Sequence, residues 1–179
     1  MATSDHDIVQ TLSKTPEKGF RLLMAKYKEP IYWHIRRLVG THDDAQDAAQ
    51  ETFVRVFRAI AQLDTSSSLS AWIYRIATHE ALRLIEKRKI TPVSLDDDAV
   101  SSPCLAADAY VDYHDAEAVR MQRAIRSLPT KQQLVFNLRY YDELDYAEIA
   151  HITASTPASA KANYHLAKDK IVKYLREND

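Results

Sequence analysis

The sequence predicts an all-α protein made of two small helical domains joined by a flexible acidic linker. Three observations support this fold class. The 179 residues include only two glycines, whereas all-β folds need many glycine-bearing turns. Apolar residues recur at steps of three and four in both halves of the chain. Between the halves lies an acidic segment that has no such period.

The charge of the chain is divided along its length, although the net charge is only −1. Residues 20–90 carry +4 and residues 120–179 carry +3, whereas residues 91–119 carry −7. Charge and apolar spacing together predict an N-terminal segment at 1–19, a first domain at 20–90, an acidic linker at 91–111 and a second domain at 112–179.

The first domain is expected to contain three helices. Apolar spacing places them at about residues 20–39, 44–63 and 69–89, with a polar loop at 64–68. Pro30 lies inside the first of these helices and predicts a kink or a restart, because proline has no N–H to donate. Gly40 is typical of a helix end and predicts where that helix stops.

The second domain is expected to contain shorter helices. They are predicted at about residues 112–128, 132–141, 146–152 and 157–175. Asp145 and Thr156 are suited to cap the last two helices, and Pro157 suits a first helical position. A short helix, a four-residue turn and a longer helix form the outline of a helix-turn-helix.

Composition and spacing exclude several classes of function. The two glycines are too few for a phosphate-binding loop. None of the seven histidines lies at a metal-ligand spacing, and Cys104 has no basic neighbour. We therefore predict no catalytic residue, metal or cofactor, and interpret the acidic run at 96–98 as solvated linker. No apolar run is long enough to enter a membrane, and no secretory signal is visible, which predicts a reducing compartment.

Two surfaces carry side chains suited to nucleic acid. On the last predicted helix, the residues outside the apolar stripe include serine, lysine and asparagine, which bind phosphates or base edges. The end of the helix at 69–89 is rich in lysine and arginine, which attract a phosphate backbone. A solvated amphipathic helix has the same pattern, so spacing alone leaves both interpretations open.

Three segments resemble motifs of bacterial sigma factors, in the same order. Residues 44–57, DAQDAAQETFVRVF, are similar to the family's D-A-E-D-x-x-Q-E-x-F segment. Residues 71–89, AWIYRIATHEALRLIEKRK, resemble its W-L-Y-R-I-A segment, and residues 124–150 resemble its A-L-x-x-L-P-x-x-x-R-x-V-F segment and the Y-x-E-I-A that follows. The order, spacing and acidic linker are similar to those of the extracytoplasmic-function (ECF) group, and the run Asn163-Tyr164-His165 resembles Bacteroidetes members.

The resemblance implies a cytoplasmic bacterial protein without enzymatic activity or a small-molecule substrate. Its implied partners are core RNA polymerase, through the β′ clamp helices and the β flap, promoter DNA and an anti-sigma factor. A region 2-like first domain would read and help to melt the −10 element. A region 4-like helix-turn-helix would read the −35 element. Ala154 stands in its turn where the family usually has glycine.

The resemblance also implies site residues. The core polymerase-binding residues are Asp47, Gln50, Glu51 and Phe53. The −10 DNA-binding residues are Ser66, Ser67, Ser68, Arg75, His79, Lys87 and Arg88. The −35 DNA-binding residues are Ser159, Lys161, Asn163, His165 and Lys168.

Two other functions compete with this interpretation. A helix-turn-helix regulator that acts without polymerase would use the second domain but would not need the surface around Gln50 and Glu51. An enzyme or metal protein would need a ligand or catalytic set, and the spacing of the residues supplies none.

Overall fold

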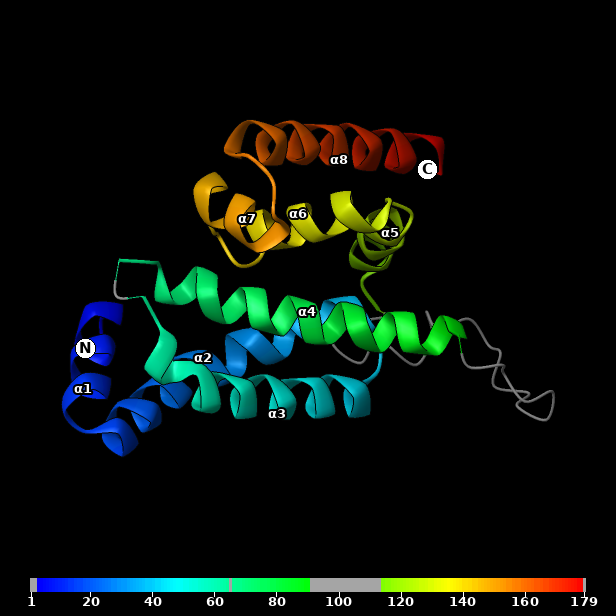
Figure 1. The fold of residues 1–179 in the computed structure, drawn as a ribbon. Coiled ribbons are helices and arrows are strands. Elements are labelled where there is room, and N and C mark those ends of the chain that lie inside the picture. The colour runs from blue at the N-terminus through cyan, green and yellow to red at the C-terminus, as the bar shows by residue number, and fades with distance from the viewer. Residues whose placement is uncertain (1–2, 65, 91–113, 179) are drawn as a thin grey trace. The chain divides into compact units, whose positions relative to one another are not determined.

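The computed structural model describes residues 3–64, 66–90 and 114–178, and every regular element in these ranges is a helix. Contacts divide the chain into two compact units, Met1–Ser101 (unit 1) and Ser102–Asp179 (unit 2). The all-α fold class with two helical domains is confirmed (Figure 1). Cys104 and the acidic run at 96–98 lie outside the described residues.

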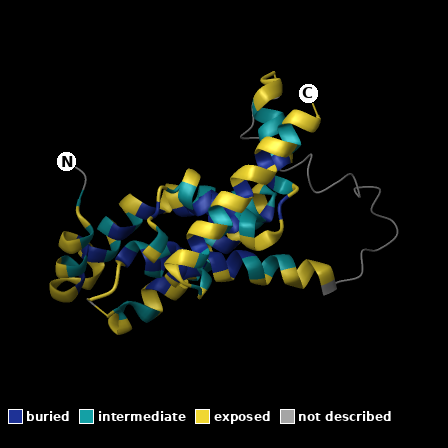
Figure 2. Ribbon diagram, turned by 90° about the horizontal axis from the view of Figure 1, so that it is seen from above, coloured by how far each residue is buried: buried dark blue, intermediate teal, exposed yellow. Residues whose placement is uncertain are grey.

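Unit 1 is a bundle in which three long helices pack against one another. Its elements are α1 (Asp5–Lys14), α2 (Pro16–Val39), α3 (His42–Ala59), the 3₁₀ helix η1 (Ile60–Gln62) and α4 (Leu69–Ile90). Helices α2, α3 and α4 contact each other pairwise, and α1 packs on α2 and α4. Ile35, Val56 and Ile73, one from each long helix, are fully buried. Figure 2 shows the buried residues in dark blue along the helices.

Helix α1 has no counterpart among the elements predicted from the sequence. A capping box begins it: the Ser4 hydroxyl accepts from the Asp7 N–H at 3.1 Å, and the Asp7 carboxylate accepts from the Ser4 N–H at 3.4 Å. Ile8 and Leu12, four residues apart, are buried. A cap followed by an apolar pair at helical spacing was therefore present in the sequence.

The sequence predicts a kink or a restart at Pro30, and the restart does not occur. One helix runs from Pro16 to Val39 through this residue. Pro30 is exposed, so the carbonyl that it leaves without an N–H donor faces the water side of the helix. Tyr27 and Ile31 are buried on a neighbouring face of the helix, and their packing holds the helix together on both sides of Pro30. The predicted end at Gly40 is confirmed, because Gly40 caps α2 with a left-handed φ of 86°.

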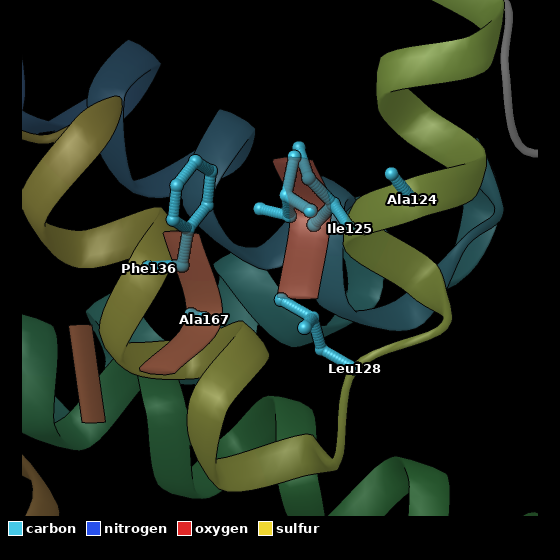
Figure 3. Close-up of a cluster of buried hydrophobic side chains, with 6 residues drawn as sticks. Ala124, Ile125, Leu128, Phe136 and Ala167 are labelled. Atoms are coloured by element: carbon cyan, nitrogen blue, oxygen red, sulfur yellow. The ribbon is translucent and has the colours of Figure 1, made fainter. Parts of the chain in front are cut away.

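Unit 2 consists of four helices, three of which share one apolar cluster. They are α5 (Ala116–Arg126), α6 (Thr130–Tyr140), α7 (Tyr146–Thr153) and α8 (Pro157–Glu177). Figure 3 shows the centre of the cluster, where Ile125 and Leu128 meet Phe136 and Ala167. Helix α8 contributes Ala167 and Ile171 to the cluster and contacts each of the other three helices. The position of α8 is therefore set by the whole unit.

Candidate nucleic-acid interface

Helices α7 and α8 form the predicted helix-turn-helix, and local caps fix where each helix begins. The Asp145 carboxylate accepts from the Glu148 N–H at 2.8 Å, and the Glu148 carboxylate accepts from the Asp145 N–H at 3.2 Å. The Thr156 hydroxyl accepts from the Ser159 N–H at 3.1 Å, and Pro157 takes the first helical position. The predicted caps at Asp145 and Thr156 are confirmed.

The turn between these helices depends on one left-handed residue, Ala154. Its φ of 49° and ψ of 48° lie in a region that costs a non-glycine residue roughly 1–2 kcal/mol. Two interactions hold the turn: the Ser155 N–H donates to the Ala150 carbonyl at 2.9 Å, and the hydroxyls of Ser155 and Thr153 lie 2.8 Å apart. Ala154 therefore adopts a conformation that glycine reaches without strain.

The five residues predicted to read DNA on α8 divide into two rows. At 100° per residue, Lys161, His165 and Lys168 lie along one edge of the exposed face, and all three are exposed. Ser159 and Asn163 lie along the other edge and are half-buried. The Asn163 side-chain amide donates to the Ser159 carbonyl at 2.9 Å, so one of its donors is already used within the helix.

Between these two rows, α8 presents small side chains that sequence analysis did not select. Ala158 and Ala162 are both exposed. An alanine strip lets a helix approach base edges closely, and its methyl groups suit contact with thymine. Helical spacing alone places Ala158 and Ala162 between the two polar rows, so the sequence could have identified them as part of this face.

An aromatic stack supports the inner face of α8. The Tyr164 ring lies parallel to Phe136 of α6, with centroids 5.8 Å apart. The Lys168 ammonium lies 5.5 Å from the centroid of the Tyr164 ring, within cation–π range. This contact places the Lys168 charge at the edge of the exposed face of α8.

On unit 1, the exposed side of α4 carries the basic residues predicted to contact the −10 element. Arg75, His79 and Lys87 are exposed. Arg88 forms an ion pair with Asp44 of α3, so part of its charge is compensated within the unit. The predicted set therefore contains three outward-facing basic side chains and one that also joins two helices.

The loop before α4 is ordered by hydrogen bonds to Asp64. The Ser66 N–H donates to the Asp64 carboxylate at 2.9 Å, and the Ser67 N–H donates to the Asp64 carbonyl at 2.9 Å. The hydrogen bonds from Ser66 hold the pKa of the Asp64 carboxyl below its ordinary value of 3.8. The Ser68 hydroxyl accepts from the Ala71 N–H at 3.2 Å and caps α4. Ser66, Ser67 and Ser68 are all exposed.

The outward face of α3 combines polar and apolar side chains. Asp47 and Gln50 are exposed there, and Glu51 is half-buried. Two large apolar residues share this face: Val54 is 41% exposed and Phe57 is 56% exposed. Exposed aromatic side chains of this size in a compact bundle are typical of a surface that binds another protein.

Phe53, which was grouped with these residues, lies in the core. Its side chain is only 7% exposed. The ring of Phe57, one turn later, contacts Phe20 of α2 edge-on, with centroids 5.2 Å apart, and leaves its other side in solvent. The accessible aromatic side chain on this face is therefore Phe57, which sequence analysis did not select.

Comparison with known proteins identifies both units. The Sigma-70 region 2 model matches residues 23–90, and the Sigma-70 region 4 model matches residues 118–171. The chain belongs to the sigma-70 family. The two matches correspond to the bundle of unit 1 and to the helix-turn-helix of unit 2.

The relatives of this sigma factor are of the ECF type. The ECF RNA polymerase sigma factor SigW of Bacillus subtilis is 28% identical over 180 residues, which cover 94% of this chain and 95% of SigW. CnrH, solved in complex with the cytosolic domain of CnrY, has a TM-score of 0.75 at 16% identity over 98% of this chain and 99% of CnrH. RpoE, solved with the anti-sigma factor NepR from Bartonella quintana, has a TM-score of 0.69 at 17% identity over 89% of this chain and 98% of RpoE.

The matches to both sigma-70 regions and to SigW support an ECF sigma factor, and sigma factors as a family are transcription initiation factors and not enzymes. In the part of the chain that the structure describes, no cluster of His, Cys, Asp or Glu is arranged to hold a metal ion. Within the same residues, no helix has the length and apolar character needed to cross a membrane.

A chain of ion pairs connects α3 and α4 of this sigma factor. The Glu80 carboxylate on α4 is 5% exposed and pairs with Arg55 at 2.6 Å and with Arg83 at 2.7 Å. Arg55 on α3 also donates to Glu51 at 3.1 Å. The two arginines compensate the cost of burying the Glu80 carboxylate. The pair with Arg55 also links the polar face of α3 to α4. Glu80 follows the buried Ala77 by three residues, so helical spacing places it on the inner face of α4, but the sequence does not indicate its arginine partners.

Proposed function

We propose that this sigma factor binds core RNA polymerase through the outward face of α3. The observation that carries the proposal is the pair of exposed apolar residues, Val54 and Phe57, beside the polar residues Asp47 and Gln50. Apolar side chains supply most of the energy of a protein interface, and polar neighbours allow the two proteins to separate again. The family's contact with the β′ clamp helices corresponds to this surface, and unit 2 would contact the β flap.

The proposal assigns the reading of promoter DNA to two surfaces. In unit 1, the loop serines and the exposed basic side chains of α4 would bind the melted −10 strand, because hydroxyls can reach an extruded base and cations attract its phosphates. In unit 2, the exposed face of α8 would enter the major groove at −35. The Asn163-Tyr164-His165 run on this face supports the proposed resemblance to Bacteroidetes members.

An anti-sigma factor is the third proposed partner. Two proteins whose folds resemble this one were solved in complexes: CnrH with the cytosolic domain of CnrY, and RpoE with the anti-sigma factor NepR. The exposed apolar side chains on α3 support the proposal, because an inhibitor that covered them would prevent polymerase from binding.

The substitution Asp47→Arg tests the polymerase contact. Placing a large cation on this face should lower affinity for purified core polymerase by roughly tenfold or more, because like-charge and desolvation penalties at interfaces cost several kcal/mol. Core affinity is measured by fluorescence anisotropy of the labelled full-length protein. Glu29→Arg makes the same change of charge at an exposed position of α2 and serves as the matched control.

The expected result is a loss of core affinity for Asp47→Arg only, with the helix content of both variants unchanged. Equal core affinity of Asp47→Arg and the unsubstituted protein would contradict the assignment of this face. Promoter-specific binding without any core polymerase would instead favour a regulator that acts alone.

A further inference from the structure

A groove of about 600 Å³ lies between α1 and the start of α4. Ser67, Ser68 and Leu69 form one wall, and residues of α1 form the other, including Val9, Gln10 and Lys14. Helix α1 precedes the segment that matches the region 2 model, which begins at residue 23. The groove therefore joins the loop serines to an element outside that match.

We propose that α1 completes the −10 site, so that an unpaired nucleotide of the melted promoter strand lies in this groove between Gln10, Lys14 and the loop serines. The inference rests on the proposed function of the loop, and it adds residues of α1 as determinants of −10 specificity. The volume of the groove is in the range of sites that hold small molecules or single nucleotides.

The wall formed by α1 is fixed in place by packing. Ile8 is fully buried and Leu12 is 9% exposed on its inner face. A Cβ added at Gly19 of α2 would lie 2.5 Å from the Leu12 backbone nitrogen, so the two helices approach this closely only because residue 19 is glycine. Such an approach gives α1 a defined position opposite the loop, as a specific binding site requires.

The chemistry of the α1 wall suits a base edge and a phosphate. The side-chain nitrogen of Gln10 lies 3.0 Å from His6 Nε2, so the imidazole orients the amide. A glutamine amide can both donate to and accept from a base edge. Lys14 is exposed at the last turn of α1, where its ammonium can bind the phosphate of the same nucleotide.

The one carboxylate that lines the groove does not oppose an anionic ligand. Asp5 accepts from the Lys26 ammonium and from the Tyr27 hydroxyl, each at 2.8 Å. Its charge is therefore compensated from α2.

The mixed lining of the groove, in which polar groups stand beside apolar surface, suits the phosphate and the base of a nucleotide. Hydroxyl, amide, imidazole and ammonium groups line it, and apolar surface, including the side chains of Val9 and Leu69, lies beside them. Leu69 is itself only 2% exposed and adds little area for an apolar anchor. A docked protein segment would need a larger apolar pocket for its central side chains.

Two variants test the inference in the complete complex. The quantity measured is the affinity of the full-length protein, bound to core polymerase, for a promoter identified by run-off transcription. The promoter DNA is prepared with its −10 region premelted. For Lys14→Ala, the slope of log affinity against log salt should become shallower by about 0.7, the value for one single-strand phosphate. Lys28→Ala removes an exposed lysine of α2 that does not line the groove, and it should leave the slope unchanged.

Gln10→Ala should weaken binding roughly tenfold, and only when one particular base is present. Each −10 position is replaced in turn by an abasic site. The loss of affinity caused by Gln10→Ala and the loss caused by the abasic site are then combined in a double-mutant cycle. The prediction is that Gln10→Ala causes no further loss at the one position that Gln10 reads. Equal affinities and salt slopes for both variants and the unsubstituted protein would overturn the inference.

Failure of this inference differs from failure of the proposed function. If the unsubstituted protein directs core polymerase to promoters while the Gln10 and Lys14 variants match it, only the role of α1 is wrong. If the unsubstituted protein does not direct polymerase at all, the proposed function is wrong as well.

Discussion

The two candidate DNA-binding surfaces of this sigma factor are built in different ways. In unit 2 the surface is one helix, α8, whose start is set by the Thr156 cap and the turn at Ala154, all within a few residues. In unit 1 the surface combines α1, the loop before α4 and α4 itself, which are brought together by packing over long sequence separations. Substitutions remote in sequence should therefore affect the surface on unit 1 more than the surface on unit 2.

The largest effect is expected for Gly19→Ala. The added methyl group would lie 2.5 Å and 2.6 Å from two backbone atoms of Leu12, and overpacking of this kind costs about 1–3 kcal/mol. Helix α1 should separate from α2, and affinity for the premelted −10 strand should fall. Hydrogen exchange measured by mass spectrometry should show faster exchange in residues 5–14 and no change in α8.

Gly40→Ala is the control for this substitution. Gly40 has a φ of 86°, so alanine there should cost about 1 kcal/mol and affect mainly the end of α2. If Gly19→Ala left exchange in α1 unchanged, or increased it equally in both units, the proposed difference between the units would be wrong.

A smaller effect is expected for Thr156→Ala, which removes the cap of α8. The Ser159 N–H would lose its acceptor, and loss of such a cap costs about 1 kcal/mol. Exchange should increase in the first turn of α8, and −35 binding should weaken, while unit 1 stays unchanged. Thr41→Ala removes the corresponding cap of α3 and should affect unit 1 alone. Transmission of either effect to the other unit would contradict the account.

The smallest effect is expected from pH. The Asp64 carboxylate accepts from the Ser66 N–H, and this bond lowers the pKa of the carboxyl below 3.8. A group whose pKa is lowered in the folded state stabilises its surroundings above its unfolded pKa and stops doing so as the pH falls through the folded value. Protection of the Ser66 amide, measured by NMR, should therefore persist at about pH 5 and decline below about pH 4.

Asp64→Asn is the matched variant for this titration. It keeps a side-chain acceptor but removes the charge, so Ser66 protection should no longer change with pH in this range. A decline that persisted in Asp64→Asn would show that another group is responsible.

Local signals in the sequence were enough to predict unit 2. Asp145, Thr156 and Pro157 act on residues three or four positions away, so their roles can be inferred from spacing alone. The same kind of signal was present at Ser4 and Asp7, yet helix α1 was not among the predicted elements. Its apolar content, mainly Ile8 and Leu12, is small, and its stability comes from packing on α2.

Other features could not be predicted, because distant contacts decide them. Phe53 is buried while Phe57 is exposed, and the position of Phe57 depends on its contact with Phe20 of α2. Burial of Glu80 depends on Arg55 from α3. The groove between α1 and the loop requires the approach at Gly19, whose role depends on the helix packed against it.

The central claim is that this sigma factor directs core RNA polymerase to its promoters. Run-off transcription of genomic DNA with purified core polymerase, with and without the full-length protein, tests it most directly. The account predicts discrete new transcripts only when the protein is present, and their loss with Asp47→Arg. The same set of transcripts with and without the protein would contradict it.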